Sequence, residues 1–294
     1  MIRSTIFSFD RACQIDLLLR SIEINAKDVF NINVLYKYSN EEYKNGYEIL
    51  KSRFPNVNWV EETDFKKQTL EIIDSDFEYV CFGVDDDVFF SEIKGEEEII
   101  NALKENQDAV CFSLRQGLNT NRCYTMRCDN IILPDKEDDK FIYWNWTTRY
   151  ADASYWFSTD FHIFRTKDIK RMIKATNFNT PNTFEGNAQS VAETYPKEVM
   201  IAYKHSKVVN SPNNIVNTTH PNRVGEQFGI SAKELNDKYL DGYIIDYDSI
   251  DFSAVNGAHC ELKYGFKKQL DDVLDGDNSY KKLGKGMNPT CIIF

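Results

Sequence analysis

The chain of 294 residues contains no apolar run that approaches the length of a membrane span, no internal repeat and no low-complexity linker. A spanning helix needs about 20 apolar residues in succession, so we expect no transmembrane segment. Positive charge is also scarce, because 35 Lys and Arg face 46 Asp and Glu, which gives a net charge of −11. A nucleic-acid-binding protein would present a basic face, so nucleic acid is not expected as a partner.

No signal peptide opens the sequence, and its seven cysteines are an odd number. We therefore expect a reduced protein with a cytoplasmic location. Cys123 and Cys128 are five residues apart, and no second pair at zinc-ligand spacing follows, so a zinc site is not expected. The final residues 291–294, which begin with Cys291, match a prenylation box. Coincidence is the favoured interpretation of that match.

Strand-like and helical patterns alternate through the first third of the chain. Apolar runs predict strands at residues 5–9, 32–36, 57–60 and 79–84, and helical spacing predicts helices at 15–24, 43–54 and 65–73. This βαβαβαβ order indicates a parallel sheet covered by helices on both faces, with ligands at the carboxyl ends of the strands. Further on, the patterns predict strands at 109–114, 161–165 and 207–209 and helices at 96–105, 168–175, 184–194 and 231–239.

Three consecutive acids, Asp85, Asp86 and Asp87, follow the strand predicted at 79–84, and the apolar residues 88–90 come directly after them. No basic residue lies beside the acids in the sequence, so the cluster needs a positive partner. The usual partner is a hard divalent cation such as Mg²⁺ or Mn²⁺, which also binds substrate phosphates. A solvated acidic turn is the alternative, although the flanking apolar residues count against it. Asp10 and Arg11 follow the first predicted strand, so we expect them at the same edge as a part of the binding site. A simple turn is the alternative.

The stretch from residue 115 to 160 is irregular and rich in aromatic side chains. A long irregular segment within a compact domain is usually functional or disordered, and its aromatic content argues against disorder. Trp144, Trp146, Tyr155 and Trp156 are therefore candidates for lining a groove. The alternative is that these large side chains belong to the core.

The sheet that ends in Asp85-Asp86-Asp87, the irregular aromatic middle and a late histidine, His259, together resemble a GT-A-fold, nucleotide-sugar-dependent glycosyltransferase of bacterial or viral type. The acids look like the Asp-X-Asp motif of that superfamily, and residues 7–11 resemble its first nucleotide-contacting loop. Residues 113–119, 158–165 and 181–185 also have the look of such enzymes. The resemblance covers roughly residues 1–267.

This resemblance implies an α/β, Rossmann-like GT-A fold, with a mixed, mostly parallel sheet flanked by helices and a loop-rich acceptor-side half. It implies one catalytic domain over residues 1–266, with a nucleotide-sugar-binding half (1–114) and an acceptor-side half (115–266). Residues 267–294 would form a C-terminal extension.

The implied activity is a metal-dependent hexosyl or pentosyl transfer, in polysaccharide biosynthesis, from a UDP- or GDP-linked donor to a glycan or saccharide acceptor. Mn²⁺ or Mg²⁺ would stabilise the diphosphate leaving group. The implied acceptors include lipid-linked glycans. For such an acceptor the protein would attach peripherally to a membrane. A nucleotidyltransferase of related fold is one alternative, but residues 8–12 contain no glycine for its nucleotide loop. A non-catalytic carbohydrate-binding protein is another, but it would give the acid cluster no purpose.

The resemblance also implies roles for individual residues. Asp87 and His259 would ligate the metal, although His259 could equally be a surface or core histidine. Asp85 would face the ribose or base, and Asp86 could serve either role. The residues expected to bind the nucleotide sugar are Phe9, Asp10, Arg11, Lys67, Asp85, Asp86, Arg115 and Lys263.

An enzyme that inverts the anomeric centre needs a carboxylate to take the proton of the acceptor hydroxyl. Glu185 is the first candidate for this base, and Asp160 and Asp152 are its rivals. In a retaining enzyme Glu185 would orient the acceptor instead, and the sequence does not decide between these outcomes. Trp144, Trp146 and Trp156 would bind the acceptor.

Overall fold

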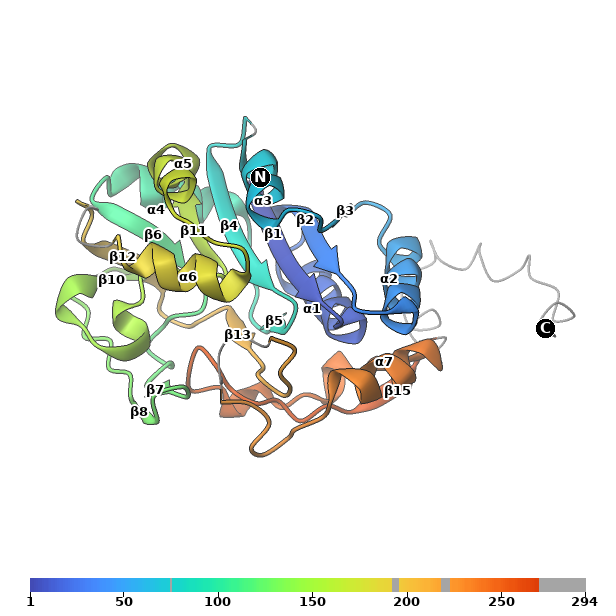
Figure 1. Cartoon of the computed structure of the whole chain (residues 1–294). Coiled ribbons are helices and arrows are strands. Elements are labelled where there is room, and N and C mark those ends of the chain that lie inside the picture. The colour runs from blue at the N-terminus through green and yellow to red at the C-terminus, as the bar shows by residue number, and fades with distance from the viewer. Residues whose placement is uncertain (75, 192–195, 218–222, 270–294) are drawn as a thin grey trace, which may run out of the picture.

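A nine-stranded mixed sheet forms the centre of the molecule (Figure 1). The computed structural model describes residues 1–74, 76–191, 196–217 and 223–269. The strand order is β3-β2-β1-β4-β11-β6-β12-β10-β9. Only β11 and β10 run opposite to the other strands of this sheet, so it is mixed and mostly parallel, as predicted. Its strands are β1 (Ile2–Phe9), β2 (Phe30–Lys37), β3 (Asn58–Glu61), β4 (Tyr79–Val84), β6 (Ala109–Ser113), β9 (Lys136–Glu137), β10 (Phe141–Asn145), β11 (His162–Arg165) and β12 (Val199–Tyr203).

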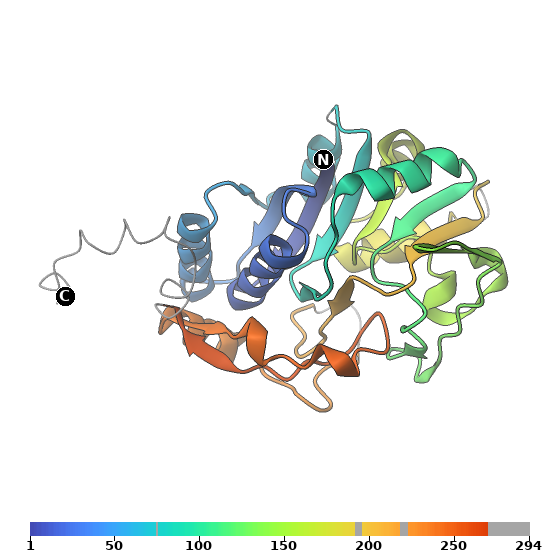
Figure 2. The ribbon, with the colours of Figure 1, turned by 180° about the vertical axis from the view of Figure 1, so that it is seen from behind.

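Helices cover both faces of this sheet, as Figures 1 and 2 show from opposite sides. They are α1 (Ala12–Asn25), α2 (Glu41–Arg53), α3 (Phe65–Ile73), α4 (Glu96–Glu105), α5 (Thr166–Ala175), α6 (Pro181–Gln189) and α7 (Ala232–Leu240). The buried hydrophobic residues form two clusters. On β1, Ile6 belongs to the first cluster and its neighbour Phe7 to the second. Side chains alternate across a strand, so the two clusters lie on opposite faces. Helices α1 and α4 cover the first cluster, and α3, α5 and α6 cover the second.

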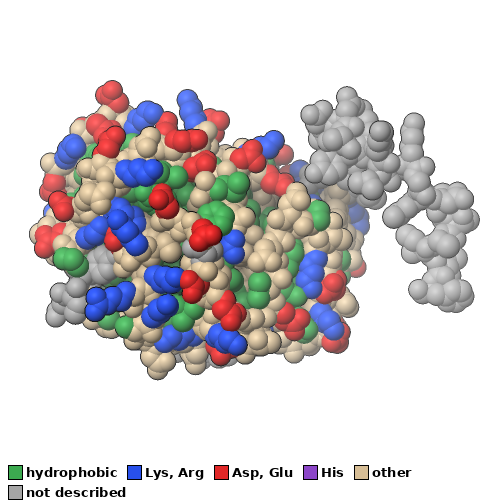
Figure 3. All heavy atoms as spheres, turned by 90° about the horizontal axis from the view of Figure 1, so that it is seen from above, with side chains coloured by type: hydrophobic (Ala, Val, Ile, Leu, Met, Phe, Trp, Pro, Cys, Tyr) green, Lys and Arg blue, Asp and Glu red, His purple; other side chains and the backbone are tan. Residues whose placement is uncertain are grey.

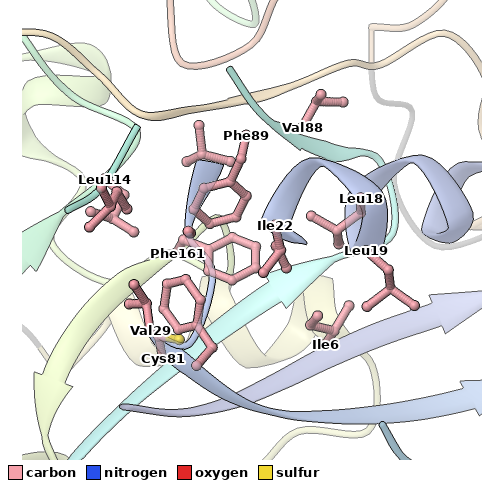
Figure 4. Packing of buried hydrophobic residues seen from close by; sticks show 14 of the residues in the cluster. Ile6, Leu18, Leu19, Ile22, Val29, Cys81, Val88, Phe89, Leu114 and Phe161 are labelled. Atoms are coloured by element: carbon pink, nitrogen blue, oxygen red, sulfur yellow. The ribbon is translucent and has the colours of Figure 1, made fainter. Parts of the chain in front are cut away.

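Aliphatic side chains surround the aromatic rings of Phe89 and Phe161 in the first cluster (Figure 4). Phe89 meets Phe161 edge to face, with ring centroids 4.8 Å apart, beside Ile22 of α1. Phe89 belongs to β5 (Asp87–Phe89), which pairs with β13 (Val208–Asn210) outside the main sheet. This packing fixes the position of β5 directly after the acid cluster.

The C-terminal part of the described chain packs back onto the first helices. A hairpin of β14 (Tyr243–Ile245) and β15 (Phe266–Lys268) follows α7, and α7 contacts both α1 and α2. The buried carboxylate of Asp16 accepts a hydrogen bond from the Tyr239 hydroxyl, and Arg20 donates to the carbonyl oxygen of Ile245. Strands from both sides of residue 114 belong to the central sheet. The single domain over residues 1–266 stays a prediction. The division into two halves stays a prediction, and most of the predicted extension, with Cys291, lies outside the described residues.

Strand β10 and strand β12 were not predicted. Both are five residues long and mostly buried, so neither shows the alternation that marks a half-exposed strand. The elements that were predicted lie within about five residues of their predicted bounds. Six other short strands among the described residues were also missed: β5, β9, β14, β15, β7 (Arg122–Cys123) and β8 (Cys128–Asp129).

The surface at the end of the molecule where β1 begins shows no single sign of charge. Figure 3 shows Lys and Arg interspersed there with Asp and Glu. None of the helices among the described residues is both long and apolar enough to cross a membrane.

Candidate active site

A cavity of about 770 Å³ opens at the carboxyl ends of β1 and β4. Residues from widely separated parts of the chain line it. The charged ones are Arg11, Lys37, Glu62, Asp85, Asp86, Arg115, Asp152, Asp160, Glu185, Arg223 and His259. This is the edge at which parallel sheets bind ligands. The cavity has the size of a site for a small molecule.

Arg11 is the positive partner of the acid cluster. Its guanidinium group donates to Asp85 and to Asp86, each at 2.9 Å, from the turn that follows β1. Its other nitrogens donate to the side-chain and backbone oxygens of Asn214, at 2.8 and 2.6 Å. Burial opposes the charge of this side chain, but Asp86 and Asp85 raise the pKa of Arg11. No basic residue adjoins the acids in the sequence, but folding brings them one from 74 residues away.

The three acids differ in their access to the cavity. Asp85 and Asp86 line it, whereas Asp87 is fully buried and does not. Burial raises the pKa of Asp85 to about 6 in spite of Arg11, and burial together with Asp160 raises the pKa of Asp87 well above its usual range. Asp87 is held by hydrogen bonds from the Val84 backbone at 3.0 Å and from the Asn210 side chain at 3.2 Å.

Asp10 shapes the turn and is not among the cavity-lining residues. Its φ of 58° lies in the left-handed region, which Asp tolerates better than most residues, and its carboxylate accepts from the Ser39 backbone at 2.7 Å. Its neighbours Phe9 and Arg11 line the cavity, and the Phe9 backbone donates to Asp85 at 3.0 Å.

A second cluster centres on Arg115, which is 2% exposed. It forms ion pairs with Asp160 and, at 3.0 Å, with Asp152, and it donates to the Ser158 hydroxyl at 3.1 Å. Burial opposes the charged form of each partner. Asp160 and Asp152 nevertheless raise the pKa of Arg115, and Arg115 in turn lowers the pKa of Asp160. Arg115 therefore holds both rival acids as ion-pair partners.

Glu185 lies in the second turn of α6, beside this cluster. A capping box between Thr180 and Thr183, with Pro181 in the first turn, starts the helix at the cavity wall. One carboxylate oxygen of Glu185 accepts hydrogen bonds from the Ser158 hydroxyl and the Thr159 backbone. Burial, and then Asp160, raise the pKa of Glu185. A carboxylate with a raised pKa that lines a cavity is suited to accept a proton.

His259 reaches the site through a backbone contact with the end of β13. Asn210 and His259 form an isolated parallel bridge, in which the Asn210 backbone donates to Ala258 and the Cys260 backbone donates to Asn210, both at 2.9 Å. The His259 Nε2 lies 3.5 Å from an oxygen of Asp160. The structure thus brings His259 and Asp160 to the same cavity as Asp85 and Asp86.

The predicted metal pair does not fit this arrangement. Asp87 does not line the cavity, and Asp85 and Asp86 are engaged by Arg11. Among the described residues, no group of three or more His, Cys, Asp or Glu side chains is placed to hold a metal ion. The protein side chains alone therefore do not form the Asp87–His259 site that the resemblance implies.

Two lysines and three tryptophans expected in the site lie elsewhere. Lys67 is exposed on α3, 3.9 Å from Glu71, and Lys263 is exposed and does not line the cavity. The three tryptophans belong to the core under α3, α5 and α6; Trp144 and Trp156 are fully buried and Trp146 is 8% exposed. The expectation that the three tryptophans form an acceptor groove is wrong, because the hydrophobic effect buries them in the core. Of the four aromatic residues considered for a groove, Tyr155 lines the cavity.

Sequence reasoning missed Ser158, Asn210 and Asn214 as individual site residues. Asn210 and Asn214 hold the acids and Arg11, and Ser158 joins Arg115 to Glu185. A signal was present for the two asparagines, since a polar turn follows the strand predicted at 207–209 and would be expected at an edge of the sheet.

The chain has a detectable relative among curated proteins. It is 30% identical, in an alignment of 213 residues, to the bifunctional glycosyltransferase pgtA of Dictyostelium discoideum. That alignment covers 63% of this chain and 28% of the relative, so the chain spans just over a quarter of the relative's length. No family model matches the sequence.

The comparison with solved structures found likenesses to two proteins, all with TM-scores below 0.5. TarS of S. aureus has a TM-score of 0.46 and 15% identity, over 72% of this chain and 37% of that one. Its fragment 1–349 in complex with UDP has a TM-score of 0.45 and 14% identity, over 72% and 62%. The mannosyltransferase PcManGT of Pyrobaculum calidifontis, in complex with GDP-Man and Mn²⁺, has a TM-score of 0.40 and 13% identity, over 69% and 54%.

Proposed function

We propose that the protein is a glycosyltransferase that moves a sugar from a UDP- or GDP-linked donor to a glycan or saccharide acceptor. The observation that carries the proposal is one cavity that joins two buried arginine–carboxylate clusters, Arg11 with Asp85 and Asp86, and Arg115 with Asp152 and Asp160. The identity with part of a bifunctional glycosyltransferase supports it.

The arrangement suits the charge changes of glycosyl transfer. Breaking the bond to the anomeric carbon places negative charge on the departing diphosphate and positive charge on the sugar ring. Arg11, at the edge where a nucleotide would lie, offers a fixed positive charge to the former, and the Asp85–Asp86 carboxylates restrict the nucleotide to one orientation. The reacting sugar would lie between this cluster and Asp160.

Glu185 is the proposed base for the acceptor hydroxyl. It lines the cavity, and Ser158 and Thr159 fix one of its oxygens. Asp160 and Asp152 are less suited to this role because both are committed to Arg115. If the enzyme retains configuration, Glu185 orients the acceptor, as the sequence also allows.

Mn²⁺ or Mg²⁺ remains the predicted cofactor. The predicted reaction remains the transfer of a hexosyl or pentosyl group to a free or lipid-linked glycan. Since the protein side chains do not fit a complete metal site, the diphosphate would have to contribute ligands. The function and the cofactor are therefore tested together.

Calorimetric titration of UDP and of GDP into the purified protein, with and without Mn²⁺, tests the proposal. We expect one nucleotide to bind, and Asp85→Asn to weaken that binding, because Asp85 lines the cavity and pairs with Arg11. Asp248→Asn, at a side chain that is 83% exposed, is the control and should bind like the wild type. Absence of binding by either nucleotide under every metal condition would overturn the proposal and favour a glycan-binding protein.

A further inference from the structure

Every carboxylate oxygen of the acid cluster already accepts a hydrogen bond from the protein. Arg11 donates to one oxygen of Asp85 and one of Asp86. The Phe9 backbone donates to the other oxygen of Asp85, and the Asn210 side chain to the other oxygen of Asp86. Asp87 receives the remaining two bonds, from Val84 and Asn210. The donors therefore satisfy the cluster without any ion.

Arg11 is the single charged donor in this set, and it is held as firmly as the acids. Its side chain is 9% exposed, and Asn214 binds two of its nitrogens. The Asn214 side chain donates in turn to the Ile230 carbonyl at 3.0 Å and to Gln14 at 3.3 Å. A divalent cation that bound Asp85 and Asp86 would have to displace this guanidinium or share the carboxylates with a fixed like charge.

We propose that Arg11 is the resident counter-ion of the acid cluster and competes with divalent cations for it. The free protein then binds Mn²⁺ weakly, and the positive charge at the donor edge is present before any ligand arrives. This inference departs from the metal pair implied by the resemblance. It rests on the proposed function only in assigning the cavity to a nucleotide-linked donor, since the competition itself requires no nucleotide.

The size of the effect follows from the removal of one nearby charge. An adjacent opposite charge changes proton binding by a carboxylate by about 1 to 3 pKa units, so loss of Arg11 should change cation binding at Asp85 and Asp86 by about tenfold or more. Arg11→Gln removes the charge and keeps a polar side chain. Arg11→Lys keeps the charge as a more compact group.

The experiment is Mn²⁺ titration of the nucleotide-free protein, followed by the electron paramagnetic resonance signal of free Mn²⁺. We expect weak binding by the wild type, binding at least about tenfold tighter by Arg11→Gln, and wild-type behaviour in Arg11→Lys. Arg122→Gln is the matched control, because Arg122 forms an exposed pair with Asp129. Circular dichroism and the melting temperature establish that each variant is folded.

If Arg11→Gln does not fold, Asn214→Ala provides a second test. This substitution removes the side-chain acceptor of Arg11 and leaves the charge of Arg11 in place. Mn²⁺ should bind more tightly to this variant than to the wild type. Tight Mn²⁺ binding by the nucleotide-free wild type would overturn the inference. Equal affinities in the wild type and the folded charge-removing variant would do so as well. Neither result bears on the proposed transfer activity, which UDP and GDP titration tests separately.

Discussion

Replacing Glu185 by Gln changes the charge of the proposed base while preserving its contacts. The carboxylate oxygen that accepts from Ser158 at 3.0 Å and from the Thr159 backbone can be replaced by a Gln carbonyl oxygen, which accepts both bonds. The variant should therefore fold like the wild type. It cannot accept a proton, and general base catalysis typically contributes about 10² to 10⁴ in rate. We expect kcat to fall by about that factor, which corresponds to about 3 to 5 kcal/mol of activation free energy.

The pH dependence of the rate provides a second measurement on the same residue. Burial and Asp160 raise the pKa of Glu185. A base acts in its ionised form, so wild-type kcat should fall as the pH drops through that raised pKa, above the usual value of about 4.3 for Glu. The acidic limb should be absent from the residual activity of Glu185→Gln.

The assay is nucleotide release in the presence of acceptor, with nucleotide affinity measured in parallel to show an intact donor site. Glu48→Gln, at an exposed side chain of α2, is the control for a loss of one negative charge. A kcat within twofold of the wild type, or an unchanged acidic limb, would refute the assignment of Glu185 as base. A rise in the acceptor KM alone would assign it to acceptor orientation.

Two further predictions concern stability. The Glu261 carboxylate accepts from the backbone N–H groups of Glu226, Gln227 and Phe228 at 2.7 to 2.8 Å. Glu261→Gln leaves about two of these partly buried N–H donors without an acceptor, so it should lower the free energy of unfolding by about 1 to 3 kcal/mol in urea titration at pH 7. Burial opposes ionisation, but these bonds lower the pKa of Glu261. The difference in unfolding free energy between wild type and variant should therefore be fully present above pH about 4.3 and shrink as the pH falls below it. A difference that does not change with pH would contradict this account. Trp156→Phe should lower the melting temperature and leave the acceptor KM unchanged, because Trp156 is fully buried; a raised KM at unchanged stability would restore an acceptor-binding role.

The regular part of the fold was predictable because its signals are local. Helix α3 begins and ends where the spacing of apolar residues predicts, and β4 matches its predicted bounds. Strands β10 and β12 escaped because a short strand buried on both faces has no alternation to detect. The mixed direction of the sheet came from the family resemblance, since the strand pattern alone predicts a parallel one.

The strand pattern predicts where Arg11, Asp85 and Asp86 lie, but not which residues they pair with. The acids and Arg11 were expected at one edge because the ends of parallel strands meet there, and the cavity lies at that edge. Their pairing depends on a turn with a φ of 58° at Asp10, which composition and spacing do not reveal. The tryptophans illustrate the opposite error, because a cluster of aromatic residues in a polar segment can serve the core as well as a groove.

The contact between Asn210 and Asp86 joins residues 124 positions apart. His259, which bridges to Asn210, lies further still along the chain. During synthesis the strands that carry the acids emerge from the ribosome long before these partners. Until then Asp86 and Asp87 lack the amide that binds them both, and their mutual repulsion is offset only in part by Arg11. The cavity edge of the sheet is therefore completed last, and shortening the chain before residue 260 should leave a sheet with an unfinished cavity.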